Sequence, residues 1–175
     1  MSENDLSWLA SLIKSRNTID GKMATLIGRS AQANNVGEYI AASIFKIAFE
    51  EVGKQRGYDG RFTQGPLAGK TVDVQWHPRH DGQINIRQDA YPDYYLILAG
   101  PESASTSLAN PWIIETVFLF QANELLNALR ERGVQIGSGT SITGPLWERA
   151  AIYPVPRNTK LVLSDEERKL LFLFS

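Results

Sequence analysis

Two acidic residues of the first half of the chain have the type and spacing that a metal site needs. Asp73 lies in Lys70–Trp76, "KTVDVQW", whose alternation of polar and apolar residues predicts a strand. Asp59 lies 14 positions earlier in "GYDGRF", between glycines that allow a sharp turn or a close backbone approach. Hard carboxylate oxygens of this kind bind Mg²⁺ or Mn²⁺.

The predicted strand also separates its side chains by face. Successive side chains point to opposite sides of a strand. One face therefore carries Val72, Val74 and Trp76, and the other is polar, with Thr71, Asp73, Gln75 and His77. If this strand is considered alone, a sheet face that is half exposed to solvent would explain its polar side.

A third acid, Glu38, prolongs the apolar stripe of a helix predicted over Gly37–Val52. A carboxylate at the end of a buried face is costly unless a cation or hydrogen bonds compensate it. Acids are also favoured in the first turn of any helix, so the functional and the structural interpretations have about equal weight.

Gly69-Lys70-Thr71 looks like the end of a nucleotide-binding P-loop, but the pattern fails. Gly65 precedes Gly69 by three intervening residues instead of four, and Lys70 opens a strand instead of a helix. Without a helix N-terminus the phosphate loses its cradle of backbone N–H groups.

The order of these residues resembles that of the PD-(D/E)XK, or restriction-endonuclease-like, nuclease superfamily. Its helix acid matches Glu38, its first Asp matches Asp59, and its second acid matches Asp73, while Gln75 stands where the family usually has Lys. "PDYYLIL", from Pro92, is similar to the apolar strand that often follows. The match covers roughly residues 30–100. Several blocks also resemble uncharacterised bacterial proteins.

The resemblance implies a divalent-metal-dependent DNA endonuclease, of the kind that acts in restriction or phage defence. It implies that Mg²⁺ or Mn²⁺ is held by Glu38, Asp59, Asp73 and the Val74 carbonyl. Gln75 carries no charge, so Lys70 or Arg61 would have to compensate for the missing lysine. The alternative is a catalytically inactive module of the same fold that binds nucleic acid or a partner protein.

A second placement of the motif puts Pro92-Asp93 first and Glu115-Thr116-Val117 second. It is worse, because the lysine position is then a valine within an apolar run.

Basic residues around the predicted strands are candidates for contacts with a phosphate backbone. They are Arg61, Lys70, His77, Arg79 and Arg87. Each could equally lie in an ordinary solvated turn. The net charge of −1, from 18 basic and 19 acidic residues, gives no general attraction for nucleic acid.

The order of elements favours one domain over residues 1–175, in the α/β class with α+β as the alternative. Residues 1–30 form a helical segment, residues 31–100 the nuclease core, and residues 101–175 the strands and helices that complete it. Strands are expected over 70–76, 83–87, 94–99, 112–120, 134–136 and 151–153, and helices over 4–16, 37–52, 123–132 and 164–174. The architecture expected is a central mixed sheet flanked by helices, as in restriction endonucleases.

The chain has no cysteine, which excludes disulfides and thiolate metal sites. Its start is acidic instead of basic, and no run reaches the length of a membrane helix, so a cytoplasmic location is expected. The end, "LLFLFS", is apolar enough either to pack in the core or to seal against a second subunit of a homodimer.

Overall fold

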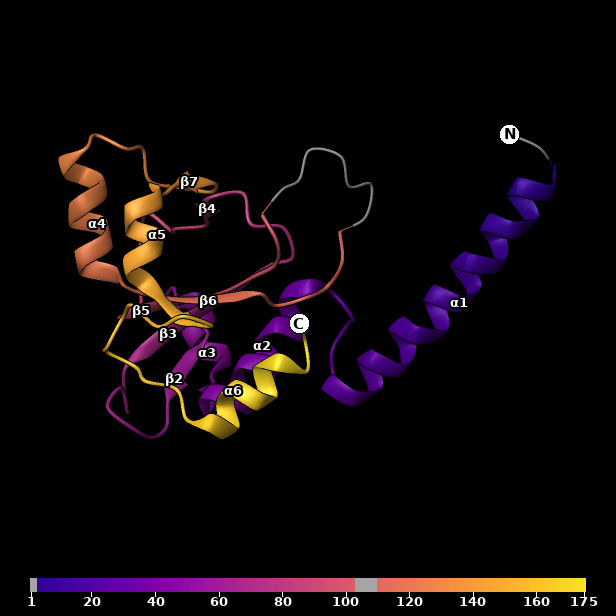
Figure 1. The fold of residues 1–175 in the computed structure, drawn as a ribbon, viewed down its shortest axis with the longest axis horizontal. Coiled ribbons are helices and arrows are strands. Elements are labelled where there is room, and N and C mark those ends of the chain that lie inside the picture. Colours follow the sequence, from indigo (N-terminus) through magenta and orange to yellow (C-terminus); the bar gives the residue numbers. More distant parts are fainter. Residues whose placement is uncertain (1–2, 103–109) are drawn as a thin grey trace.

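A mixed sheet of six strands forms the centre of the computed structural model, which describes residues 3–102 and 110–175 (Figure 1). The strand order is β1-β2-β3-β5-β6-β8, and within this sheet only the β3–β5 pair is parallel. The strands are β1 (Ile47–Phe49), β2 (Gly60–Phe62), β3 (Thr71–His77), β5 (Tyr94–Ala99), β6 (Thr116–Gln121) and β8 (Ala151–Tyr153). A separate ribbon pairs β4 (Gln83–Ile84) with β7 (Thr140–Ser141).

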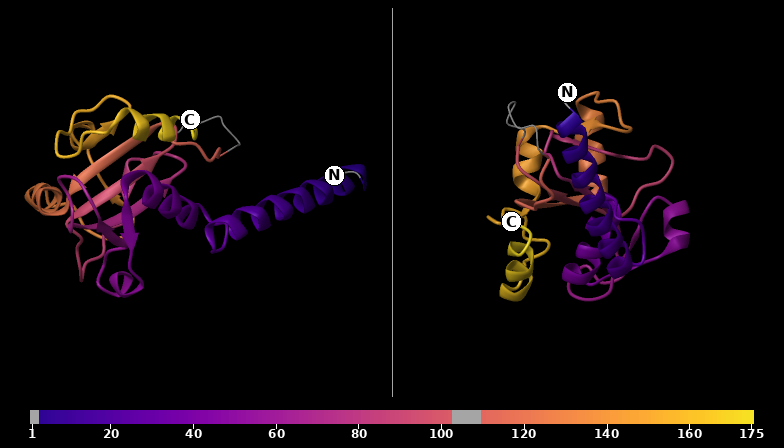
Figure 2. Two further views of the ribbon diagram at one scale, coloured as in Figure 1. Left: turned by 90° about the horizontal axis from the view of Figure 1, so that it is seen from below. Right: turned by 90° about the vertical axis from the view of Figure 1, so that its right-hand side faces the viewer.

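Helices cover both faces of this sheet. The helices of the described residues are α1 (Glu3–Ile27), α2 (Ala33–Phe45), α3 (Glu51–Gln55), α4 (Ala122–Glu131), α5 (Gly144–Ala150) and α6 (Asp165–Phe172). Figures 1 and 2 show α2 and α6 on one side of the sheet and α4 and α5 on the other. The prediction of a central mixed sheet flanked by helices is therefore confirmed.

Each face has its own apolar core, as the alternation along the strands requires. Val72, Val74 and Leu96 point toward α2 and α6, whereas Tyr95 and Ile97 point toward α4 and α5. β5 is buried along its whole length because it lies between two strands and under helices on both faces. β3 pairs with β5 over six residues, so its polar side chains project from a firmly held strand.

The helix predicted over Gly37–Val52 is shorter than its pattern suggests. α2 ends at Phe45, and Lys46 takes a left-handed conformation with φ 54°. The chain then forms β1, so that Phe49 belongs to a strand instead of the helix. The apolar stripe was misleading because a buried strand and a helix face can share the same residues over short stretches.

Other boundaries differ in smaller ways. The first helix extends to Ile27, well past the end expected at residue 16, and the strand expected from Trp112 begins at Thr116. Residues 134–136 are not a strand. The closing helix is confirmed, with Ser164 as N-cap in a capping box with Glu167.

α1 stands apart from the rest of the molecule. It projects away from the body of the domain, and contacts it mainly through α2 (Figure 2). Within the described residues, no helix is both long enough and apolar enough to cross a bilayer.

Candidate functional site

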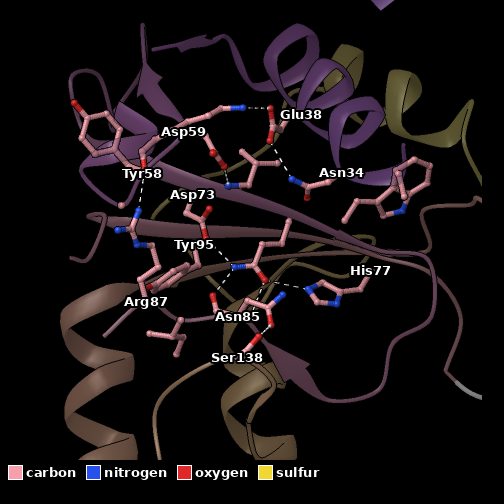
Figure 3. Close-up of a pocket in the computed structure, with 17 residues that line it drawn as sticks. Asn34, Glu38, Tyr58, Asp59, Asp73, His77, Asn85, Arg87, Tyr95 and Ser138 are labelled. Carbon is pink, nitrogen blue, oxygen red and sulfur yellow. Dashed lines mark hydrogen bonds and ion pairs between the residues drawn. The ribbon is translucent and has the colours of Figure 1, made fainter. Parts of the chain in front are cut away.

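A pocket of about 830 Å³ opens between the start of α2, the end of α3 and the polar face of β3 (Figure 3). Seven of the ten residues predicted for the site line it: Glu38, Asp59, Asp73, Val74, Gln75, His77 and Arg87. Four of them lie on β3, whereas Glu38, Asp59 and Arg87 come from other segments, so the convergence of these three with the strand depends on the fold. Arg61, Lys70 and Arg79 are the three that do not line it.

Gln75 is fixed by four contacts that use its whole side-chain amide. Nε2 donates to Asp73 Oδ2 and to the Asn85 carbonyl, both at 2.7 Å. Oε1 accepts from the Asn85 backbone N–H at 3.0 Å and lies 3.1 Å from His77 Nε2. Since Oε1 can only accept, His77 Nε2 must carry the proton.

This arrangement explains why residue 75 is a glutamine, although the resemblance predicts a lysine at this position. A lysine ammonium has three donors and no acceptor, so it could not satisfy the Asn85 N–H. Gln75 joins β3 to the segment that enters the pocket from β4, and it holds the Asp73 carboxylate in place. Its role in this geometry is to position other groups.

His77 completes the polar row on β3. Burial lowers the pKa of His77, so its imidazole is neutral at physiological pH and hydrogen-bonds Gln75. A neutral imidazole gives no charge to a phosphate contact.

Asp59 lies where the pairing of β2 with β3 stops. β2 pairs with β3 only at its first two residues, Gly60 and Arg61, and the edge of β3 beyond Val72 has no strand beside it. Asp59 Oδ2 accepts the Val74 N–H at 2.8 Å and so replaces the missing strand partner. Burial raises the pKa of Asp59, although the hydrogen bond from Val74 opposes this.

Asp73 has the most perturbed carboxyl group of the site. Burial, followed by repulsion from Asp59, raises the pKa of Asp73 to about 8. The hydrogen bond from Gln75 acts in the opposite direction and is outweighed. At neutral pH this pair of carboxyl groups therefore holds a proton that two isolated aspartates would have lost.

Glu38 is fully buried and is held by cations of the chain itself. Its Oε2 lies 2.6 Å from Arg29 Nη1 and 3.3 Å from Lys54 Nζ, and its Oε1 accepts from Asn34 Nδ2 at 3.0 Å. The energetic problem raised by a carboxylate on this helix face is thus solved by ion pairing. Glu38 lines the pocket, but two side-chain cations already share its charge.

Six polar or charged residues of the pocket were not expected from the sequence: Asn34, Lys54, Tyr58, Asn85, Tyr95 and Ser138. Lys54 comes from α3, a short helix that the sequence did not predict, and it is the only lysine among the pocket residues. Asn34, Asn85 and Ser138 come from helix-start and loop positions that carry no motif. No periodicity distinguishes such positions, so only the tertiary structure reveals them.

Tyr95 is another of these six residues. Its hydroxyl is buried beside the pocket and has no hydrogen-bond partner within the described part of the chain. Burial, then the charge of Asp73, raises the pKa of Tyr95, which keeps the phenol protonated as a donor. "PDYYLIL" signals a buried strand, but not that one tyrosine of it reaches the pocket.

The three basic residues outside the pocket have other surroundings. Arg61 bonds Glu50 at 3.0 Å and Tyr58 at 3.1 Å. Lys70 is exposed in the turn before β3. Arg79 lines a different hollow near Trp147. Neither Arg61 nor Lys70 replaces the missing lysine charge, so that expectation is corrected.

The predicted three-carboxylate metal set is only partly assembled. Across residues 3–102 and 110–175, no three His, Cys, Asp or Glu side chains form a group able to hold a metal ion. Asp59 and Asp73 do adjoin each other, and Mg²⁺ is commonly held by one or two carboxylates together with waters and substrate phosphates. Their hard oxygen donors fit Mg²⁺ or Mn²⁺, and the Val74 carbonyl stays a predicted ligand.

No family model and no curated protein matches the chain. The comparisons therefore give no relative from which a role for these residues could be taken.

Proposed function

We propose that the protein is a divalent-metal-dependent phosphodiesterase that cleaves DNA internally at the pocket of Asp59 and Asp73. The observation that carries the proposal is this carboxylate pair, in which burial raises the pKa of both groups and the charge of Asp59 raises that of Asp73 further. Perturbed acids gathered in a pocket are more frequent at functional sites than elsewhere. A cation is the natural partner of such a pair, because its charge relieves the repulsion.

Charge balance also argues for a cation. The pocket residues include three carboxylates, Glu38, Asp59 and Asp73, against two basic side chains, Lys54 and Arg87. Once Asp59 and Asp73 release the proton that they hold at neutral pH, these side chains carry a net negative charge, and a negative phosphodiester would be repelled without a further positive charge. When bound, Mg²⁺ or Mn²⁺ supplies that charge and lowers the pKa of a water.

In the hydrolysis, water adds across a P–O bond and gives a phosphate monoester and a free hydroxyl. Asp59 and Asp73 would hold the cation, and Gln75 keeps Asp73 in a fixed orientation. Within the described residues the Tyr95 hydroxyl has no partner, so it is available as a donor for a phosphate oxygen. Asn34 and Ser138 at the pocket wall have polar groups suited to the sugar-phosphate backbone.

Lys54 provides the positive charge that Gln75 lacks. Its Nζ lies 3.3 Å from Glu38 Oε2, and its charge lowers the pKa of Asp59. The ammonium is half-exposed at the pocket, so it can reach a bound phosphate. In this proposal Glu38 orients Lys54 instead of binding the metal directly.

The test is calorimetric titration of Mn²⁺ and Mg²⁺ into wild type and the Asp59→Asn/Asp73→Asn variant. We expect one saturable site in wild type that the variant loses. The matched control, Glu131→Gln/Glu166→Gln, removes two exposed acids from α4 and α6 and should bind like wild type. Equal binding by all three proteins would contradict the assignment.

Cleavage is then measured on plasmid and single-stranded DNA with either metal. Lys54→Ala should lose most of the rate and keep metal binding, since it acts on the phosphate. We expect a loss of about 100-fold or more, the size typical for one transition-state donor. Unchanged cleavage by the Lys54→Ala variant would remove that role.

A second candidate is a non-catalytic module of the same fold. It is favoured by Glu38, whose charge is already satisfied by Arg29 and Lys54, and by Gln75, whose amide is fully bonded. Metal binding without cleavage of any DNA form would select the module. No metal binding by folded wild type would also favour it.

A further inference from the structure

Helix α1 leaves a row of large apolar side chains exposed. Leu12 is 47% exposed, Ile19 56% and Leu26 71%, although none of them lies in a loop. The helix projects from the domain, so the body of its own chain does not cover this row (Figures 1 and 2). Exposed apolar surface of this extent marks an interaction site more often than chance.

The spacing along α1 is that of a coiled-coil seam. Leu9, Leu12, Arg16, Ile19, Met23 and Leu26 follow one another at alternating intervals of three and four residues. This is the a/d repeat of helices that pair along their length. The seam spans about 26 Å at roughly 1.5 Å per residue. Arg16 is its one polar member.

We propose that α1 pairs with α1 of a second copy of this chain, in antiparallel orientation. An antiparallel pair puts each a residue opposite a d residue of the other helix. With the two-fold axis between residues 17 and 18, Leu9 meets Leu26 and Leu12 meets Met23. The apolar members of these two pairs therefore face one another, and Ile19 is the one apolar residue of the seam that faces a polar residue, Arg16.

The charges on α1 select this orientation. In a parallel, in-register pair the two Arg16 side chains would face each other in the seam, which is repulsive. In the antiparallel pair Arg16 meets Ile19 and lies within about one residue's rise of Asp20 on the other helix. Asp20 already pairs with Arg16 of its own helix at 3.6 Å. The second copy therefore adds opposite charge where the seam is polar.

Sedimentation velocity over a micromolar concentration series tests the pairing. We expect wild type to form dimers, and Ile19→Glu, at the centre of the seam, to remain monomeric. Asn17→Glu adds the same charge on the outer face of α1 and should dimerise like wild type. Near-ultraviolet circular dichroism checks that the cores of all three are intact.

The proposal fails if wild type is monomeric throughout, which would assign the row to another partner protein. It also fails if Ile19→Glu dimerises as well as wild type, since another surface would then mediate assembly. In a charge swap, Arg16→Asp should raise the dimer dissociation constant, and Arg16→Asp/Asp20→Arg should restore it.

Cross-linking tests the orientation cleanly, because the chain has no cysteine of its own. A mixture of Leu12→Cys and Met23→Cys proteins should form a disulfide between the two variants. Disulfides between two copies of Leu12→Cys alone would show a parallel pair and overturn the antiparallel arrangement. This assembly does not depend on the proposed nuclease, so its failure leaves the metal titration informative.

Discussion

A carboxyl group buried beside another carboxyl group makes stability depend on pH. The pKa of Asp73 in the folded protein is about 8, against 3.8 for an ordinary aspartate. Between these values the folded state binds more protons than the unfolded state, so the free energy of unfolding falls as pH rises. The loss is largest per pH unit between the two pKa values and ends above about 8. Asp59 acts in the same direction.

Asp73→Asn should flatten this dependence. The Gln75 amide can still donate to the side-chain oxygen of the substituted asparagine. We therefore expect the variant to gain stability relative to wild type as pH rises, by up to about 1.4 kcal/mol per pH unit. Denaturant unfolding at about pH 5 and about pH 9 measures it. Parallel curves for the two proteins would contradict the raised pKa. At the higher pH, Mn²⁺ should stabilise wild type and leave the variant unchanged.

At the scale of elements, a glycine contact positions the start of α2. A Cβ added to Gly37 would lie 2.6 Å from Trp76 Cβ, so α2 approaches β3 closely only because residue 37 has no side chain. Glu38 is the next residue, and its place in the pocket follows from that approach. The packing of α2 on β3 therefore determines the geometry of the site.

Gly37→Ala should destabilise the fold by roughly 1–3 kcal/mol, because the helix must move away from β3. The proposed metal-dependent activity should fall with it, since Glu38 moves with α2 and its ion pair with Lys54 is disturbed. Gly21→Ala in α1 is the control, because a Cβ there meets nothing within 4 Å and alanine favours the helix. Thermal unfolding of both variants measures the difference in their stability. Equal melting temperatures would show that the contact is easily relieved.

Alternation and capping made much of the fold predictable from sequence. β5 lies where it was predicted, at Tyr94–Ala99, and Ser164 caps α6 as its sequence indicates. The turn at Lys46 was not predictable, because a non-glycine residue with positive φ carries no sequence signal. That turn frees α3, and with it Lys54, to approach the pocket.

The candidate site, too, was predictable from the sequence only in part. Asp59, Asp73 and Gln75 converge on the pocket as expected, and for the two on β3 strand alternation fixes which side chains share a face. The partners of Glu38 were not found, since Arg29 and Lys54 reach it from two separate segments. Pairing across a fold depends on tertiary contacts that local patterns do not encode.

Across the whole molecule, stability is unevenly distributed. β5 is buried along its length, whereas α1 contacts the body mainly through α2. The apolar C-terminus is likewise divided: Leu171 is fully buried, and Phe172 and Leu173 are mostly exposed. "LLFLFS" therefore packs partly in the core and leaves two apolar side chains at the surface.

Amide hydrogen exchange should report this distribution. We expect β5 to exchange slowest and at a rate independent of protein concentration, since its opening requires unfolding of the sheet. Amides of α1 should exchange fast when dilute and become protected as concentration rises, because pairing shields them. In Ile19→Glu that protection should stay absent. Protection of α1 that does not vary with concentration would contradict an intermolecular origin.

Arg29 lies where α1 joins the body. α1 ends at Ile27, Gly28 follows with φ +73°, and the side chain of Arg29 then bonds Glu38 at the pocket. An effect of the proposed α1 pairing on the pocket would therefore pass through this ion pair. Linkage makes such an effect reciprocal. If the proposed dimerisation alters this ion pair, a ligand that draws Glu38 from Arg29 changes the dimer's dissociation constant by the same factor by which dimerisation changes the affinity for that ligand.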